Sequence, residues 1–417
     1  VIIGGDIDLE GSIDVNGTSN LDVVDIDGAV DMASTLTVAG VLTGASLDIS
    51  GDIDIDGTTN LDVVDVDGAA NFAADVTFAD GADIITASAG TSNTRVGVNA
   101  GNSIASGGNY NVVVGDEAGT ALTTGDDNVA IGFEALKTED EHGRNVAVGY
   151  QSLKTLNAGA LAVTTTVGYK SGTSLTTGVQ NTLIGGLSGD ALTDADFNVA
   201  VGNNTLTTDT KGNKSTAIGY EALTSQNFTS STDSFNTAVG CQAGLSVTTG
   251  TENTIIGGRA GDALTDADKN VAVGSEALSA DTLGSNSVAV GRAALANQNF
   301  TSATDTYNTA VGARAGVEVT TGVNNTLIGG LAGDAITTGS QNTGIGMQSL
   351  SANTTGASGT AIGYAALLGN TTGCCNTGLG KSAMQTNTTG AENVAVGDSA
   401  LNKNTTASYN TAIGSLA

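Results

Sequence analysis

Few side chains in this sequence are suited to acid–base or nucleophilic chemistry. The one histidine, His142, lies in Glu139-Asp140-Glu141-His142-Gly143, where most repeats of the chain have a glycine turn. A base-activated nucleophile usually needs histidine, and no phosphate-binding loop, nucleophile elbow or zinc-spacing motif occurs. We therefore interpret His142 as a solvated loop residue, and we expect the chain not to be an enzyme.

The three cysteines do not form a disulfide framework. Cys374 and Cys375 are adjacent, which is poor geometry for a structural bridge. Cys241 follows a repeated glycine at a position where other repeats have Tyr, Gly, Ser or Arg. This tolerance favours a variable corner position over thiol chemistry.

Carboxylates are abundant, and they raise the question of calcium. Asp-x-Asp-Gly occurs at 25–28, 54–57 and 65–68, and paired aspartates occur in turns at Asp194, Asp196, Asp266 and Asp268. Calcium prefers clustered oxygen ligands, but neither an EF-hand loop nor the calcium β-roll repeat is present. We therefore interpret these aspartates as residues of solvent-exposed strand faces and polar turns, and we expect no cofactor. Binding of Ca²⁺ is the minor alternative.

The chain of 417 residues has a formal net charge of −30, which disfavours nucleic acid and anionic membrane surfaces as partners. No apolar run is long enough to span a bilayer, so we expect no membrane insertion. The sequence begins without Met and ends inside a repeat, so we expect it to be a segment of a longer polypeptide.

The composition indicates which elements position these residues. The chain has 60 Gly, no Pro, no Trp and 3% aromatic residues, yet 39% of its residues are hydrophobic. A core must then be built from small and β-branched side chains, and together with a regular repeat this indicates a repetitive β architecture.

From about residue 90, a glycine that closes a short apolar motif returns nineteen times, and fourteen of the eighteen intervals are 17 residues. The residue before this glycine is always Val, Ile or Leu, and the residue three before it is always Thr or Val. The residue two before it is usually Ala, and the residue four before it is Asn in fifteen units. The motif glycines are Gly97, Gly115, Gly132, Gly149, Gly168, Gly185, Gly202, Gly219, Gly240, Gly257, Gly274, Gly291, Gly312, Gly329, Gly346, Gly363, Gly380, Gly397 and Gly414.

This pattern predicts an all-β fold, a parallel β-solenoid or β-roll over 86–417 with one coil for each repeat. Each coil is expected to hold a short strand, a Gly turn, a second short strand and a polar turn. We expect the Val and Ile ladder inside the coil, the Asn side chains in a ladder at a corner, and the Ala face against a neighbouring chain. Because the Ala face is expected to contact a neighbouring chain, we expect a parallel homo-oligomer, most simply a homotrimer.

Residues 1–85 have a different pattern, an Asp-rich 40-residue duplication. Residues 14–29 read DVNGTSNLDVVDIDGA, and residues 54–69 read DIDGTTNLDVVDVDGA. Strict alternation predicts short strands with one apolar and one acidic face. We expect a β-prism-like shaft in which three chains turn Ile and Val inward and Asp outward.

Two places suggest a binding surface. Both 21-residue intervals carry an inserted loop, and from these loops the candidate receptor contacts are Asn227, Phe228, Thr229, Asn299, Phe300 and Thr301. The alternative is that the two Phe rings fold back over the rod or under a neighbouring chain. Four tyrosines share the position after the motif glycine, namely Tyr150, Tyr169, Tyr220 and Tyr364. We expect them to form either a structural stack at a corner or a stripe that binds glycans.

Units such as Ser215-Thr216-Ala217-Ile218-Gly219-Tyr220-Glu221-Ala222-Leu223 resemble the head repeats of trimeric autotransporter adhesins. The 17-residue form with Thr-Thr-Gly between motifs is more similar to repeats of phage tail fibres. The segment GDIDIDGTTNLDVVDVDGA also resembles fibre proteins of marine tailed phages. The resemblance covers nearly the whole chain and implies a trimeric β fibre.

The expected function is therefore a structural shaft of a viral tail fibre that mediates host attachment from the virion tail. Its expected partners are two further copies of itself, a glycan or protein of the host surface, and other virion tail proteins. One alternative is a trimeric adhesin on a bacterial cell surface. Another is a fibre-borne polysaccharide depolymerase with its groove between chains.

Overall fold

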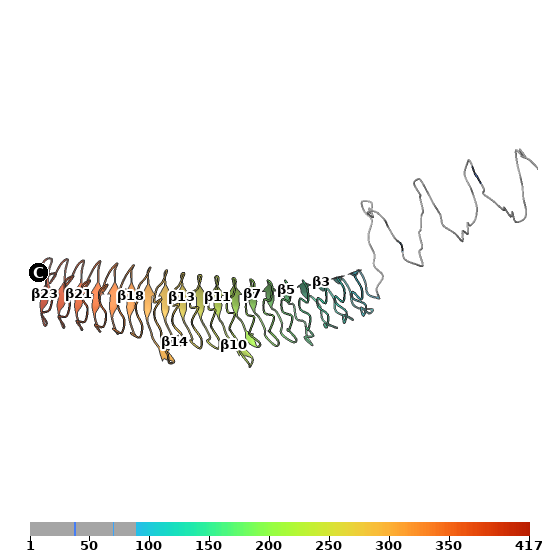
Figure 1. Ribbon diagram of the computed structural model, residues 1–417, viewed down its shortest axis with the longest axis horizontal. Coiled ribbons are helices and arrows are strands. Elements are labelled where there is room, and N and C mark those ends of the chain that lie inside the picture. The colour runs from blue at the N-terminus through green and yellow to red at the C-terminus, as the bar shows by residue number, and fades with distance from the viewer. Residues whose placement is uncertain (1–36, 39–69, 71–88) are drawn as a thin grey trace, which may run out of the picture. The chain divides into compact units, whose positions relative to one another are not determined.

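The computed structural model describes residues 37–38, 70 and 89–417. Residues 89–417 form a single stack of coils with one three-residue strand in each repeat and no helix among them (Figure 1). The predicted parallel β-solenoid with one coil for each repeat is confirmed. The predicted β-prism-like segment at 1–85 lies outside the described residues, apart from 37–38 and 70.

Nineteen strands form one parallel sheet in which each strand pairs with the equivalent strand of the next coil. The strands are β1 (Thr94–Val96), β2 (Val112–Val114), β3 (Val129–Ile131), β4 (Val146–Val148), β5 (Thr165–Val167), β6 (Thr182–Ile184), β7 (Val199–Val201), β9 (Thr216–Ile218), β11 (Thr237–Val239), β12 (Thr254–Ile256), β13 (Val271–Val273), β15 (Val288–Val290), β17 (Thr309–Val311), β18 (Thr326–Ile328), β19 (Thr343–Ile345), β20 (Thr360–Ile362), β21 (Thr377–Leu379), β22 (Val394–Val396) and β23 (Thr411–Ile413).

Within residues 89–417, the second strand expected in every coil is found only beside the two inserted loops. There β8 (Gly212–Asn213) pairs with β10 (Thr232–Asp233), and β14 (Gly284–Ser285) pairs with β16 (Thr304–Asp305). Figure 1 shows the segments around β10 and β14 projecting from the row of coils. In the described coils, with or without these extra strands, left-handed residues follow the motif glycine, such as Glu134 (φ 53°) and Leu136 (φ 50°), so the chain turns there and does not extend.

The prediction of which strand side chains face the inside of the coil is wrong. The residue two before the motif glycine points into the coil, as in Ala217 and Ala238, which are completely buried. The residues one and three before it point outward and are half-buried or exposed, as in Thr216 and Ile218. The physical reason is space, since so short a coil is too narrow to hold two rows of β-branched side chains.

The space inside a coil is limited, as the side chains at the fourth and seventh positions after the motif glycine show. Where the fourth residue after the motif glycine is Gly, the seventh is a buried aliphatic residue in Ile104, Leu122, Leu175, Leu192, Val247, Leu264, Val319 and Ile336. A Cβ on Gly189 would lie 2.7 Å from Leu192 Cδ1. Where the fourth residue is Leu or Met, the seventh is polar in all described coils but one. In most coils the fourth and seventh positions therefore share one large core side chain, and the strand of some coils adds another, such as Leu183 or Ile255.

The predicted Asn ladder at the corner is confirmed. Asn253 is fully buried, its Oδ1 accepts a hydrogen bond from the backbone N of Asn270 at 3.0 Å, and its Nδ2 donates to the carbonyl of Ala267 at 2.7 Å. Asn270 repeats both bonds one coil later, to the N of Ser287 and the carbonyl of Gly284. The side chains thus satisfy backbone groups that the turn leaves without a strand partner.

A second amide ladder runs through the last coils and was not expected from the sequence. Asn370, Asn387 and Asn404 each donate from Nδ2 to Oδ1 of the Asn one coil earlier, at 3.3, 2.9 and 2.9 Å. They occupy the seventh position after the motif glycine, where other coils bury Leu. The repeat of Asn at this position was the signal that could have revealed the ladder.

Candidate functional site

The outer face of the long sheet is a continuous uncharged surface. In every described strand of this sheet the two outward side chains are Thr, Val, Ile or Leu. Ile218, Ile256 and Ile328 are 38%, 39% and 37% exposed, which is unusual for isoleucine in a folded chain. At a spacing of about 4.8 Å per coil, nineteen strands give a face about 90 Å long.

This face is large enough for a stable interface. Two outward side chains make it about 10 Å wide, so it covers on the order of 900 Å². A standard protein–protein interface buries about 800 Å² on each partner, and contiguous apolar patches above a few hundred Å² are rare on monomers. The sheet face is therefore the main candidate for assembly.

Three aromatic rings stack in consecutive coils at the position after the motif glycine. The centroids of Phe133 and Tyr150 lie 5.3 Å apart, and those of Tyr150 and Tyr169 lie 5.4 Å apart, with interplanar angles of 16° and 12°. The three side chains are 39%, 43% and 53% exposed. Of the predicted tyrosines, Tyr150 and Tyr169 therefore stack, whereas Tyr220 and Tyr364 lie in distant coils.

The two inserted loops have the same construction. Asp209 is buried and accepts hydrogen bonds from the backbone N of Gly212 and Phe228 and from Nε2 of Gln226, at 3.0, 3.1 and 2.6 Å. Asp281 makes the same three bonds at the second loop, with Gly284, Phe300 and Gln298. A buried carboxylate thus ties each loop to the coil before it.

The structure separates the six predicted receptor contacts into two groups. Phe228 and Phe300 are 6% and 7% exposed, so their rings fold back against their own chain. Asn227, Thr229, Asn299 and Thr301 are exposed on the loop surface. Contact of these loops with a receptor stays a prediction, and within one chain only the four polar side chains are accessible for it.

The aspartates considered for calcium in the described residues bond to the turn one coil earlier. Asp194 Oδ1 accepts a hydrogen bond from Thr177 Oγ1 at 2.7 Å, and Asp196 Oδ1 accepts one from the N of Val179 at 2.8 Å. Asp266 and Asp268 make the equivalent bonds to Thr249 and Thr251. The three Asp-x-Asp-Gly motifs lie outside the described residues.

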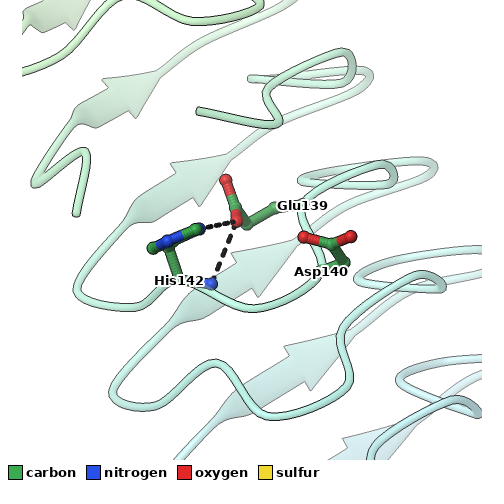
Figure 2. A group of neighbouring side chains, drawn as sticks. All are labelled: Glu139, Asp140 and His142. Carbon is green, nitrogen blue, oxygen red and sulfur yellow. Dashed lines mark hydrogen bonds and ion pairs between the residues drawn. The ribbon is translucent and has the colours of Figure 1, made fainter. Parts of the chain in front are cut away.

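A cluster of metal-ligating side chains lies in the turn after β3. Glu139, Asp140 and His142 each offer one ligand atom, and these atoms lie within 4.8 Å of one another (Figure 2). Glu139 is fully buried, and its Oε1 lies 3.1 Å from the backbone N of His142 and 3.4 Å from His142 Nδ1. Asp140 and His142 are half-buried, so the expectation of a solvated loop holds for only part of this turn.

Two glutamates in the same coil have opposite electrostatic environments. Hydrogen bonds from Lys137 and Lys154 lower the pKa of Glu134 to about 2. Desolvation by burial raises the pKa of Glu139, and two backbone N–H donors offset only part of that effect. From the sequence, we interpreted His142 as a solvated loop residue and assigned no role to Glu139 or Asp140. The signal that was missed is that Glu139 occupies the seventh position after the motif glycine, where most coils have a buried side chain.

No family model matches the chain, and neither a curated protein nor a solved structure is similar to it. Among the described residues, none belongs to a helix with the length and apolar character needed to cross a membrane.

Proposed function

We propose that this chain is the shaft of a homotrimeric tail fibre that carries a virus to its host, with three copies packed through the outer faces of their long sheets. One observation carries the proposal: the outward side chains of the nineteen strands are uncharged in a chain whose net charge is −30. Copies of so acidic a chain repel one another, and this face is one on which they can approach closely.

A trimer is the assembly that we favour for geometric reasons. Three flat faces arranged around one axis all turn inward, and cyclic symmetry closes the set without leaving an uncharged sheet face exposed. The stacked coils then give a rod whose corners and inserted loops remain accessible. Repetition supplies length, as a fibre shaft requires, because each coil contacts only its neighbours.

The assembly is tested by measuring the mass of the purified chain in solution by light scattering. We expect the mass of three chains. The triple variant Ile218→Lys, Ile256→Lys and Ile328→Lys places nine charges in the trimer interface and should shift the mass to that of one chain. The matched control places three lysines on exposed turns, at Thr177, Thr249 and Thr321, and should remain trimeric. A monomeric unaltered chain, or a triple isoleucine variant that stays trimeric, would contradict the packing.

The tail-fibre role is tested by electron microscopy with gold-labelled antibodies raised against the purified chain. The culture that carries the gene is examined for virus particles and for cells. We expect label on the tails of particles. Label confined to the bacterial surface would replace the tail fibre by the cellular adhesin, while leaving the trimeric packing intact.

A further inference from the structure

The buried carboxylate of Glu139 differs from its two counterparts in other coils. Asp209 and Asp281 occupy the same position in the repeat, and each receives a short hydrogen bond from the Nε2 of a buried glutamine, Gln226 or Gln298. Both glutamines lie at the seventh position of the following coil. In the coil that follows Glu139, this position holds Leu156, which has no donor to offer.

The side chain that faces Glu139 is instead the imidazole of His142. Its Nδ1 lies 3.4 Å from Glu139 Oε1, is shielded from solvent, and has no hydrogen-bond partner. Buried polar atoms of side chains are rarely left without a partner in native proteins. Glu139 Oε1 accepts a hydrogen bond from the backbone N of His142, and its contact with Nδ1 is an ion pair when the imidazole is protonated. With a neutral imidazole, the oxygen and the nitrogen are placed so that both can bind one cation.

We propose that Glu139, Asp140 and His142 bind one divalent transition-metal ion of the Zn²⁺ type. Their ligand atoms lie within 4.8 Å of one another, close enough to share an ion after small side-chain adjustments. Imidazole nitrogen with carboxylate oxygen is a donor set that suits Zn²⁺, Co²⁺ or Ni²⁺. Calcium is a poorer fit, because it takes six to eight oxygen ligands.

The surroundings of the cluster favour a cation. His142 also lines an open hollow of about 250 Å³, whose wall includes Asp126, Asp127 and Glu141. Arg144 also lines this hollow and forms an ion pair with Asp127 at 3.9 Å, so one guanidinium stands against three carboxylates. Three protein ligands leave a coordination position for water on the side of the solvent.

The site is tested by titrating the full chain, purified without a polyhistidine tag and stripped of metal, with ZnCl₂ in a calorimeter. We expect one ion per chain, and binding of Co²⁺ should produce a visible absorption band. Because His142 is the only histidine, diethyl pyrocarbonate modifies one imidazole in each chain, and bound Zn²⁺ should protect it. CaCl₂ should not compete at equal concentration.

The variants separate this site from adventitious binding. His142→Gln and Asp140→Asn change half-buried side chains, so both variants should fold, and each should weaken Zn²⁺ binding by more than about tenfold. Glu252→Gln changes an exposed carboxylate in a distant coil and should bind the ion as the unaltered chain does. Absence of stoichiometric Zn²⁺ binding, or undiminished binding by His142→Gln, would overturn the proposal.

Discussion

Replacing Gly257 with Ala should lower the free energy of unfolding by about 3 kcal/mol, whereas the same change at Gly258 should have almost no effect. Gly257 has φ +136°, and a Cβ there would lie 2.6 Å from the carbonyl carbon and oxygen of Gly274 in the next coil. These are backbone atoms, so no side chain can move aside to relieve the overlap. A Cβ on Gly258 meets nothing within 4 Å.

The two neighbouring glycines therefore form a matched pair. Chemical unfolding of both variants is followed by circular dichroism at one protein concentration, because an oligomer's stability depends on concentration. Limited proteolysis should also cut Gly257→Ala near the pairing of β12 with β13, because a solenoid is destabilised locally. Equal stability of the two variants would show that the stacked motif glycines are not required by sterics.

Replacing Asn253 with Ala should also cost about 3 kcal/mol, because it breaks the ladder of buried amides at one coil. The change removes the acceptor for the backbone N of Asn270 and the donor to the carbonyl of Ala267, and both partners are buried. Each buried group left without a partner costs about 1–3 kcal/mol.

A suitable control for this change is Asn203→Ala. Asn203 is exposed and donates one hydrogen bond, to the carbonyl of Gly186 in the previous coil. Its loss should change the free energy of unfolding by no more than about 0.5 kcal/mol, because water replaces the partner. If Asn253→Ala and Asn203→Ala were equally stable, the buried ladder would have no energetic role.

Much of the fold was predictable from the sequence, because repetition makes local preferences add along the chain. The regular period predicted the coils, and the Asn four before the motif glycine predicted the corner ladder, since only a few side chains satisfy turn backbone groups in this way. The second strand was predicted wrongly for most coils, because no local preference of residues such as Leu136 indicates a left-handed conformation.

Of the candidate site, the sequence supplied the residues but not their arrangement. His142, Glu139 and Asp140 were visible as neighbours in one turn. Whether the side chain of Glu139 points into the coil or into solvent depends on the space inside that coil, which only the three-dimensional structure shows. The burial of Phe228 and Phe300 likewise follows from loop anchors at Asp209 and Asp281, which lie 19 residues earlier in the chain.

The sequence by itself determined the period, the positions of the nineteen strands of the long sheet, the obligatory glycines and the corner amides, because each depends on one residue type at one place in the repeat. It also showed that the residues one and three before the motif glycine share a face. Only the tertiary structure decided which face is inside, because alternation in a strand defines two faces but not the volume behind either. A coil that closes within one short repeat has room for one inward row of strand side chains. That row holds Ala217 and, in other coils, Leu183 or Ile255, and so the other two rows form the outer face.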